Sequence, residues 1–160
     1  MAHNTFHVAL YVKDIPTAVE QYRKILGIEP AKVKHDYAKF EMTDPPVIFS
    51  LNLGGEPGTV SHLGIRYPGT GEVATEMVRT KMQEIEMLEQ QGTTCCYAKA
   101  DKFWVRDADG MPWEMYTLLA DVEAQTAADL QLRGFLGQKT TTPEASTQAE
   151  ACCAPSCCAT

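Results

Sequence analysis

The chain has 160 residues, of which 44% are hydrophobic, a composition that suits one ordinary globular domain with a substantial core and excludes an intrinsically disordered chain. It carries 14 basic against 21 acidic side chains, a net charge of -7, and it has no block of Lys and Arg. This acidic balance predicts neither a nucleic acid nor an anionic membrane surface as a partner.

The first half of the chain reads as a strand, a helix and three further strands. Alternating residues predict a strand over residues 5–12. A helix follows over residues 15–26, where apolar side chains recur at three-to-four spacing and where Gly27 is placed to end the last turn. Turn-forming residues then divide three short strands, which we expect at residues 31–34, 37–42 and 46–53.

The second half repeats this order. We expect a strand over residues 60–67, a longer helix within residues 71–91 that ends at Gly92, and strands near residues 93–98, 102–106 and 112–119. Two strand-helix-strand-strand-strand modules, at about 5–53 and 60–119, predict an α+β fold in a single domain over residues 1–120. Residues 121–160 are expected to form a C-terminal extension, which could begin with a short helix and continues as a disordered tail of small and polar residues.

Two histidines open the corresponding first strands of the two modules. His7 begins HVAL and His62 begins HLGI, so paired modules could bring them to one centre. In DADGMPWEMYT, a DG turn leads to Glu114, and strand alternation places Glu114 and Tyr116 on one face. Two imidazoles and one carboxylate are the ligand set of non-haem iron(II) oxygenases, and they leave positions open for substrate or dioxygen.

Each of these residues also has an ordinary interpretation. A single histidine at the start of a strand is more often structural or exposed than a ligand, and a glutamate on a terminal strand is usually solvated. The joint occurrence of His7, His62 and Glu114 at repeat-related positions favours a metal site. In the first module the position that matches Glu114 is assigned to Ile48, so no fourth carboxylate ligand is expected.

All six cysteines occur as adjacent pairs, which are Cys95-Cys96, Cys152-Cys153 and Cys157-Cys158. A disulfide framework usually joins distant cysteines and zinc ligands are typically spaced along the chain, so soft thiophilic ions or vicinal redox chemistry remain. A regular strand would turn Cys95 and Cys96 to opposite faces, so a pair that acts together predicts a flexible loop of irregular backbone between the second helix and the following strand. Their polar surroundings in TTCCYAKADKFW weaken the interpretation of both as small buried hydrophobes.

The expected compartment bears on these thiols. No apolar run approaches the roughly 20 residues of a membrane span, and MAHNTFHVAL lacks the basic and apolar regions of a signal peptide. We therefore expect a cytoplasmic protein, monomeric or homodimeric, with reduced thiols. A vicinal disulfide between Cys95 and Cys96 is the rival, but it would close a small strained ring that a reducing cytosol disfavours.

The paired modules, together with HVAL, SHLGI and DADGMPWEMYT, resemble the vicinal oxygen chelate superfamily, which includes glyoxalases, fosfomycin-resistance proteins and extradiol dioxygenases. Within it, TTCCYAKADKFW, YAKFEMTDPPVIFSLN and the cysteine-paired tail are similar to organoarsenical carbon-arsenic lyases and to cadmium-induced proteins. The resemblance covers residues 5–120 or so, and the segment with two cysteines is its most discriminating part. It implies a sheet that curls around a metal site.

The resemblance also implies an activity, namely cleavage of the carbon-arsenic bond of trivalent organoarsenicals such as methylarsenite to give arsenite. Iron(II) would be the cofactor and dioxygen the co-substrate. His7, His62 and Glu114 would hold the iron, although some relatives are similar but carry glutamine in place of His7, and Cys95 and Cys96 would hold the arsenic, which is soft and thiophilic. The tail cysteines, Cys152, Cys153, Cys157 and Cys158, would form an accessory arsenic site.

Two other functions stay open at this level. A glyoxalase-like isomerase or thiol transferase would use the same scaffold, but it would require more carboxylate ligands than the sequence offers. A non-catalytic cadmium- or arsenite-binding protein would use the three cysteine pairs to sequester soft ions. Oxygen consumption in the presence of methylarsenite distinguishes these functions.

Overall fold

The computed structural model describes residues 3–95 and 98–121. In this part of the chain the order strand-helix-strand-strand-strand occurs twice, which confirms the predicted α+β fold. The first module consists of β1 (Thr5–Tyr11), α1 (Ile15–Leu26), β2 (Lys32–Val33), β3 (Tyr37–Thr43) and β4 (Pro46–Asn52). The second module consists of β5 (Val60–Arg66), α2 (Thr70–Met82), β6 (Met87–Cys95), β7 (Ala98–Arg106) and β8 (Pro112–Asp121).

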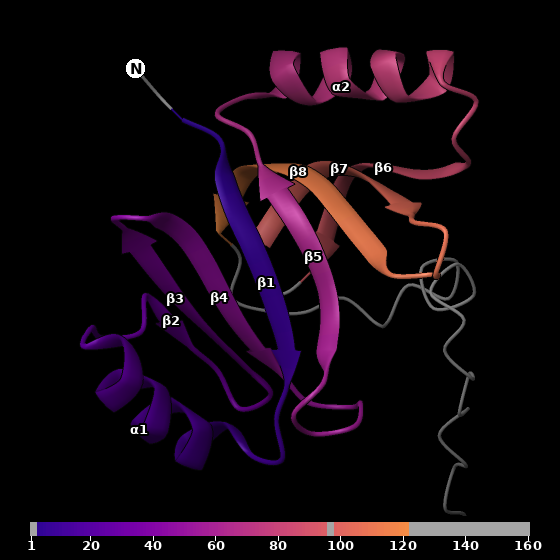
Figure 1. Ribbon diagram of the computed structural model, residues 1–160. Coiled ribbons are helices and arrows are strands. Elements are labelled where there is room, and N and C mark those ends of the chain that lie inside the picture. The colour runs from indigo at the N-terminus through magenta and orange to yellow at the C-terminus, as the bar shows by residue number, and fades with distance from the viewer. Residues whose placement is uncertain (1–2, 96–97, 122–160) are drawn as a thin grey trace, which may run out of the picture.

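The strands of the described residues form one eight-stranded sheet, in the order β2-β3-β4-β1-β5-β8-β7-β6. The first strands of the two modules, β1 and β5, are antiparallel neighbours at its centre. Each is flanked on its other side by the last strand of its own module, which runs parallel to it: β4 beside β1 and β8 beside β5. The sheet curls, with the two helices outside it (Figure 1). Residues of all four central strands therefore share one inner face.

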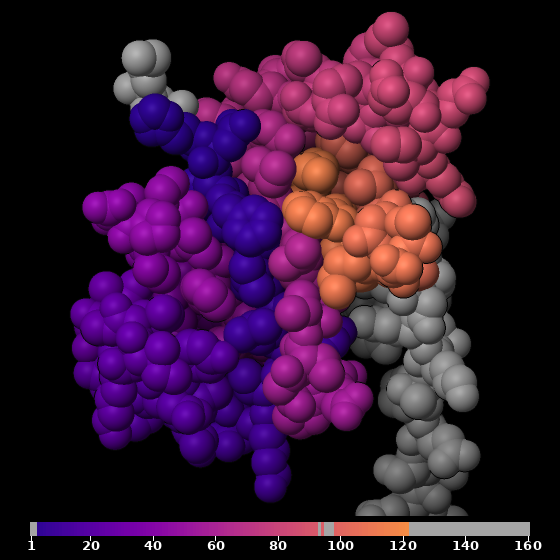
Figure 2. Space-filling model, in the orientation of Figure 1, coloured from indigo at the N-terminus to yellow at the C-terminus, as the bar shows by residue number. Residues whose placement is uncertain are grey.

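The hydrophobic core lies on the outer face of the sheet, under the helices. The cluster under α1 contains Ile15, Ala18, Ala38, Phe40 and Leu51. The cluster under α2 contains Tyr67, Val73 and Phe103. Between the two helices, residues of β1 and β5 lie at the surface (Figure 2). Alternate residues of a strand point to opposite faces. The residues that lie between the outward apolar ones therefore line the inner face.

The first helix has its predicted bounds because local signals mark both of its ends. The Asp14 carboxylate accepts a hydrogen bond of 2.9 Å from the backbone N–H of Thr17, in the manner of an N-cap. At the other end Gly27 has a φ of 69°, and its N–H donates to the carbonyl of Arg23 at 2.9 Å. This left-handed conformation costs glycine little, so the helix stops there.

The second helix is shorter than predicted, because it ends at Met82 and the chain forms strand β6 from Met87. Gly92, expected to end the helix, instead lies inside β6 at a register shift between Gln90 and Thr93. Its φ is 57° and its N–H donates to the carboxylate of Asp101 at 2.7 Å. The glycine therefore marks a β-bulge, which the sequence pattern did not distinguish from a helix end.

A search of the described residues for a helix of the length and apolar character needed to cross a membrane found none.

Candidate metal centre

Strand pairing at the centre of the sheet places the predicted ligands side by side. Between β1 and β5, His7 is opposite Gly64 and Ala9 is opposite His62. Between β5 and β8, Gly64 is opposite Glu114. His7, Gly64 and Glu114 thus form one row across three strands, with His62 two residues before Gly64. The three predicted ligands come from β1, β5 and β8, and all three lie on the inner face.

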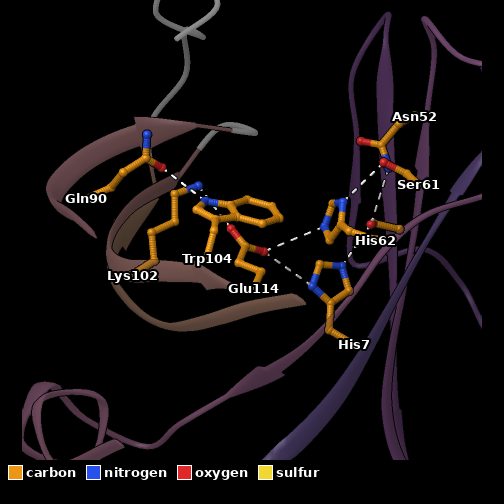
Figure 3. A network of polar contacts seen from close by, with 9 residues as sticks. His7, Asn52, Ser61, His62, Gln90, Lys102, Trp104 and Glu114 are labelled. Atoms are coloured by element: carbon orange, nitrogen blue, oxygen red, sulfur yellow. Dashed lines mark hydrogen bonds and ion pairs between the residues drawn. The ribbon is translucent and has the colours of Figure 1, made fainter. Parts of the chain in front are cut away.

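The structure brings these three side chains together around one point (Figure 3). Glu114 Oε2 lies 3.6 Å from His7 Nδ1 and 3.7 Å from His62 Nε2. One ligand atom of each residue lies within 4.8 Å of those of the other two. The two imidazole rings meet edge to face with centroids 5.2 Å apart. This spacing leaves room for an ion among two nitrogens and one oxygen.

A serine hydroxyl faces the far nitrogen of each imidazole. Ser50 Oγ lies 2.9 Å from His7 Nε2, and Ser61 Oγ lies 3.1 Å from His62 Nδ1. In the part of the chain that the structure describes, His7 Nδ1 is the buried side-chain nitrogen or oxygen that has no hydrogen-bond partner. An unfilled lone pair costs less there than an unsatisfied N–H, so we assign the proton to Nε2, which donates to Ser50.

This arrangement fits a metal ion. The assignment leaves the lone pair of His7 Nδ1 aimed at Glu114, and the same logic leaves His62 Nε2 as an acceptor. Metal-binding histidines commonly donate their other ring N–H to an oxygen, which fixes the tautomer and the ring orientation. A divalent cation would give the buried Nδ1 atom the partner that it lacks among the described residues.

The protonation states at the centre also suit a cation. Burial lowers the pKa of His62 to about 3, a shift that Glu114 opposes and that His7 and Lys102 reinforce, so the imidazole is neutral at pH 7. Burial acts to raise the pKa of Glu114, but the positive charge of Lys102 is the main cause that opposes it and holds that pKa below its ordinary value. A neutral imidazole and an ionised carboxylate are the forms that bind metals.

Gly64 allows Glu114 to lie close to β5. A Cβ at Gly64 would lie 2.5 Å from the Glu114 carbonyl oxygen and 3.3 Å from its Cβ. The equivalent residue of the first module is Ala9, which is fully buried and faces the same way. Position 64, beside the strand that carries the carboxylate, therefore requires glycine because a larger residue would clash with Glu114.

The position in the first module that is equivalent to Glu114 is Ser50. The pairing of β1 with β5 relates Ala9 to Gly64, and their partners on the parallel strands are Ser50 and Glu114. The assignment of this position to Ile48 was therefore wrong by two residues. A two-residue shift keeps a side chain on the same face, so alternation alone could not detect the error. Ser50 is not a carboxylate either, and its hydroxyl serves His7.

Sequence reasoning missed three residues, Lys102, Trp104 and Gln90, that contact Glu114, His62 or each other. Lys102 is 2% exposed, and its Nζ lies 2.9 Å from Glu114 Oε1. Trp104 packs edge to face against His62 with centroids 5.1 Å apart, and its indole N–H donates to Gln90 at 3.1 Å. A signal was available, because alternation along β7 places Lys102 on the same inward face as Trp104, where a charged side chain has no solvent to face.

The structure describes the cysteines only in part. Cys95 is the last residue of β6 and pairs with Ala98 of β7. Cys95 is therefore not in a loop between α2 and the following strand, as expected, but at the far end of that strand. Cys96 lies outside the described residues, and so do the tail cysteines Cys152, Cys153, Cys157 and Cys158.

Comparison with known proteins identifies the family. The sequence model of the Glyoxalase/Bleomycin resistance protein/Dioxygenase superfamily matches residues 5–115. The chain belongs to this superfamily. A solved structure with a similar fold is homoprotocatechuate 2,3-dioxygenase from Arthrobacter globiformis, which aligns with a TM-score of 0.56 at 18% identity over 75% of this chain and 37% of that chain.

Two relatives within the superfamily are much more similar in sequence. A trivalent organoarsenical cleaving enzyme from Bacillus sp. (strain MD1) is 42% identical over 122 residues, which cover 73% of this chain and 74% of that protein. The cadmium-induced protein CadI of Mycobacterium tuberculosis (strain ATCC 25618 / H37Rv) is 39% identical over 117 residues, which cover 72% and 77%. In sequence the chain therefore resembles these two proteins much more than it resembles the solved dioxygenase.

Proposed function

We propose that the protein is an iron(II)- and dioxygen-dependent carbon-arsenic lyase, which converts trivalent organoarsenicals such as methylarsenite to arsenite. The observation that carries this proposal is the group formed by His7, His62 and Glu114 on the inner face of the sheet. The similarity to proteins named trivalent organoarsenical cleaving enzyme supports the substrate class.

In this proposal the two histidines and the glutamate hold the iron. Iron(II), when bound, supplies the redox chemistry that activates dioxygen. His7 would bind through Nδ1 and His62 through Nε2, because Ser50 and Ser61 occupy the opposite nitrogens. Three protein ligands leave coordination positions open, as non-haem oxygenases require. The buried setting limits access of water to the reacting groups.

Cys95 and Cys96 would hold the arsenic as a thiol pair. Strand β7 links them to the metal centre, since Ala98 pairs with Cys95 and Lys102 contacts Glu114. Four residues of extended strand between Ala98 and Lys102 span about 13 Å. The substrate would therefore reach the metal if the thiol pair moved toward the inner face of the sheet. Such a movement would also keep substrate and oxidant in one enclosed space.

The reaction balances without an external reductant. Methylarsenite, CH₃As(OH)₂, and one dioxygen give arsenous acid, As(OH)₃, and formaldehyde, HCHO. The carbon-arsenic bond breaks and an arsenic-oxygen bond forms. The methyl carbon loses four electrons, which dioxygen accepts, while arsenic remains trivalent. The proposal thus predicts equal amounts of arsenite and formaldehyde for each dioxygen consumed.

The test is product formation by the iron-loaded protein in air and under anaerobic conditions. Arsenite and formaldehyde should appear together in air and should not appear without oxygen or iron. Cys95→Ser and Cys96→Ser should each weaken methylarsenite binding and nearly abolish release of arsenite while iron binding is kept. Unchanged affinity and turnover in the double serine variant would rule out the thiol pair.

A second candidate is a non-catalytic protein that sequesters cadmium or arsenite. It is favoured by the similarity to proteins named cadmium-induced, at 39% identity. Such a protein should bind cadmium tightly through its cysteines and should consume no oxygen with methylarsenite. Oxygen uptake measured with and without methylarsenite therefore separates the two functions.

We also propose that the tail cysteines, Cys152, Cys153, Cys157 and Cys158, gather arsenicals or retain released arsenite without taking part in bond cleavage. Neighbouring thiol pairs raise the local thiol concentration. A variant that ends after residue 137 should keep single-turnover cleavage at saturating substrate. Loss of that turnover would assign the tail to the active site.

A further inference from the structure

Lys102 lies in direct contact with one of the proposed metal ligands. Its side chain is 2% exposed, and Nζ is 2.9 Å from Glu114 Oε1. The Trp104 ring lies on one side, with its centroid 5.2 Å from Nζ, and Gln90 is the neighbour of Lys102 across the sheet. A buried lysine is costly unless its charge is paired, and the carboxylate of Glu114 provides that pairing.

The two oxygens of Glu114 have different surroundings. Oε1 accepts the hydrogen bond from Lys102, whereas Oε2 lies between His7 and His62. These contacts come from opposite sides of the carboxylate (Figure 3). The side chain is therefore oriented with a single oxygen toward the space that a metal would occupy.

This orientation has a consequence for the number of ligands. A free carboxylate can bind a metal through one oxygen or through both. If Glu114 bound through both, it would fill a coordination position that the proposed chemistry needs for dioxygen or substrate. The ammonium group of Lys102 occupies Oε1 and prevents this second mode of binding.

We propose that Lys102 is a positioning residue that holds Glu114 as a one-oxygen ligand and so keeps a coordination position open on the metal. The inference rests on the proposed metal site and goes beyond it, because it assigns the state of coordination to a residue that does not itself touch the metal. Lys102 is well placed for this role because it shares the inner face of β7 with Trp104, directly opposite the strand that carries Glu114.

The experiment compares Lys102→Met, Lys102→Gln and Lys102→Arg with the wild-type protein. Methionine has a similar length without charge or donor, glutamine keeps a donor without charge, and arginine keeps both. Lys39→Met is the matched control, because Lys39 also lies on the inner face and pairs with a carboxylate, that of Glu41 at 2.6 Å, but does not contact the centre. The readouts are the absorption spectrum with cobalt(II) alone and the affinity of the iron(II) protein for nitric oxide, a stand-in for dioxygen.

We expect the wild-type and Lys39→Met proteins to show the intense cobalt band of a four- or five-coordinate ion. Lys102→Met should still bind cobalt, with the weak band of a higher-coordinate ion and with nitric oxide affinity reduced about tenfold. Lys102→Arg should restore much of the intense band. If the methionine variant does not fold, Lys102→Gln tests the inference in its place, because it removes the charge with a smaller change in polarity.

Two results would overturn the inference. One is a wild-type cobalt spectrum and nitric oxide affinity in both Lys102→Met and Lys102→Gln. The other is loss of cobalt binding in both variants in step with loss of folding, since that is the behaviour of a purely structural ion pair. Failure of the wild-type protein itself to bind cobalt would instead reject the proposed metal site, and the inference with it.

Discussion

The two modules share one topology and contribute unequally to the candidate centre. Each offers a histidine from its first strand, His7 or His62, and each has an inward residue at the matching place on its last strand. That residue is Ser50 in the first module and Glu114 in the second. The first module thus adds a hydroxyl that orients a histidine, whereas the second adds a charged ligand.

The strands beside Ser50 and Glu114 also differ between the two modules. Opposite Glu114 in the second module lies Trp104, with Lys102 two residues before it. Opposite Ser50 in the first module lies Lys39, whose ammonium group pairs with Glu41 rather than with the centre. A duplicated scaffold therefore provides two pairs of equivalent positions, one pair on the first strands and one on the last strands, and three of these four positions carry groups that can bind a metal.

The largest effect should come from removing a ligand supplied by the second module. His62→Ala and Glu114→Ala should weaken binding of iron(II) or cobalt(II) by about 100-fold or more and abolish turnover, because neither replacement can ligate a metal. His7→Gln should be milder, because an amide oxygen still coordinates. Ser50→Ala, the matched change in the first module, should keep the metal with an affinity lower by about tenfold, since it loses only a hydrogen bond to His7. Metal titration of the four variants checks this order, and equal losses in all four would contradict the asymmetry.

A second comparison concerns the two small residues at the centre of the sheet. Gly64→Ala should destabilise the protein by about 2 kcal/mol and displace Glu114, because the new Cβ would meet the carbonyl of that residue. Ala9→Gly should cost only about 1 kcal/mol, through backbone entropy, and should leave metal affinity unchanged. Thermal unfolding with and without cobalt measures both quantities. Equal metal affinity in the two variants would show that Gly64 has no special role.

A third effect is the response of the metal-free protein to acid. The unfolded chain protonates His62 near pH 6.5, whereas the folded protein resists this until about pH 3. Between these values the unfolded state binds more protons, so stability should fall as pH falls, by at most about 1.4 kcal/mol per pH unit from this group. Glu114, whose pKa is held low, adds to the loss below pH 4.5. Denaturant unfolding from pH 7 to pH 4 should show the slope, and His62→Gln should reduce it.

The smallest effect should come from the helix caps. The carboxylate of Asp14 caps α1, whereas Gly69 precedes α2 without a side-chain cap. Asp14→Ala should therefore cost about 1 kcal/mol of stability. It should change neither metal affinity nor turnover, because α1 lies on the outer face of the sheet. A change in metal affinity would indicate that the helices and the centre are coupled.

These differences also show what could be predicted from the sequence. The bounds of α1 were predictable because Asp14 and Gly27 are local signals. The repeat predicted that His7 and His62 lie together, because equivalent positions of paired modules converge. Strand alternation then placed Glu114 on one face of the last strand, where it could join them. The length of α2 was not predictable, because Gly92 ends a helix or forms a bulge with the same residue type, and only the bond to Asp101 decides which.

The neighbours of the ligands were harder to foresee. Ser50 was missed in favour of Ile48, because both point inward and only the pairing of β1 with β4 and β5 fixes which one matches Glu114. Lys102 was missed because a lysine on an alternating strand is normally assigned to the solvent face. Its burial depends on a partner 12 residues away in the chain, and local patterns do not report such partners.

The positions of the three candidate ligands along the chain set when the proposed site could be completed during synthesis. His7 is present from the start, but Glu114 belongs to β8, the last strand of the second module. At about 5–20 residues per second, a ribosome needs about 5–20 s to pass from one to the other. During that interval His7, joined about halfway by His62, is present without the carboxylate. The three candidate ligands are therefore complete only when the sheet receives β8, the last of its central strands to be made.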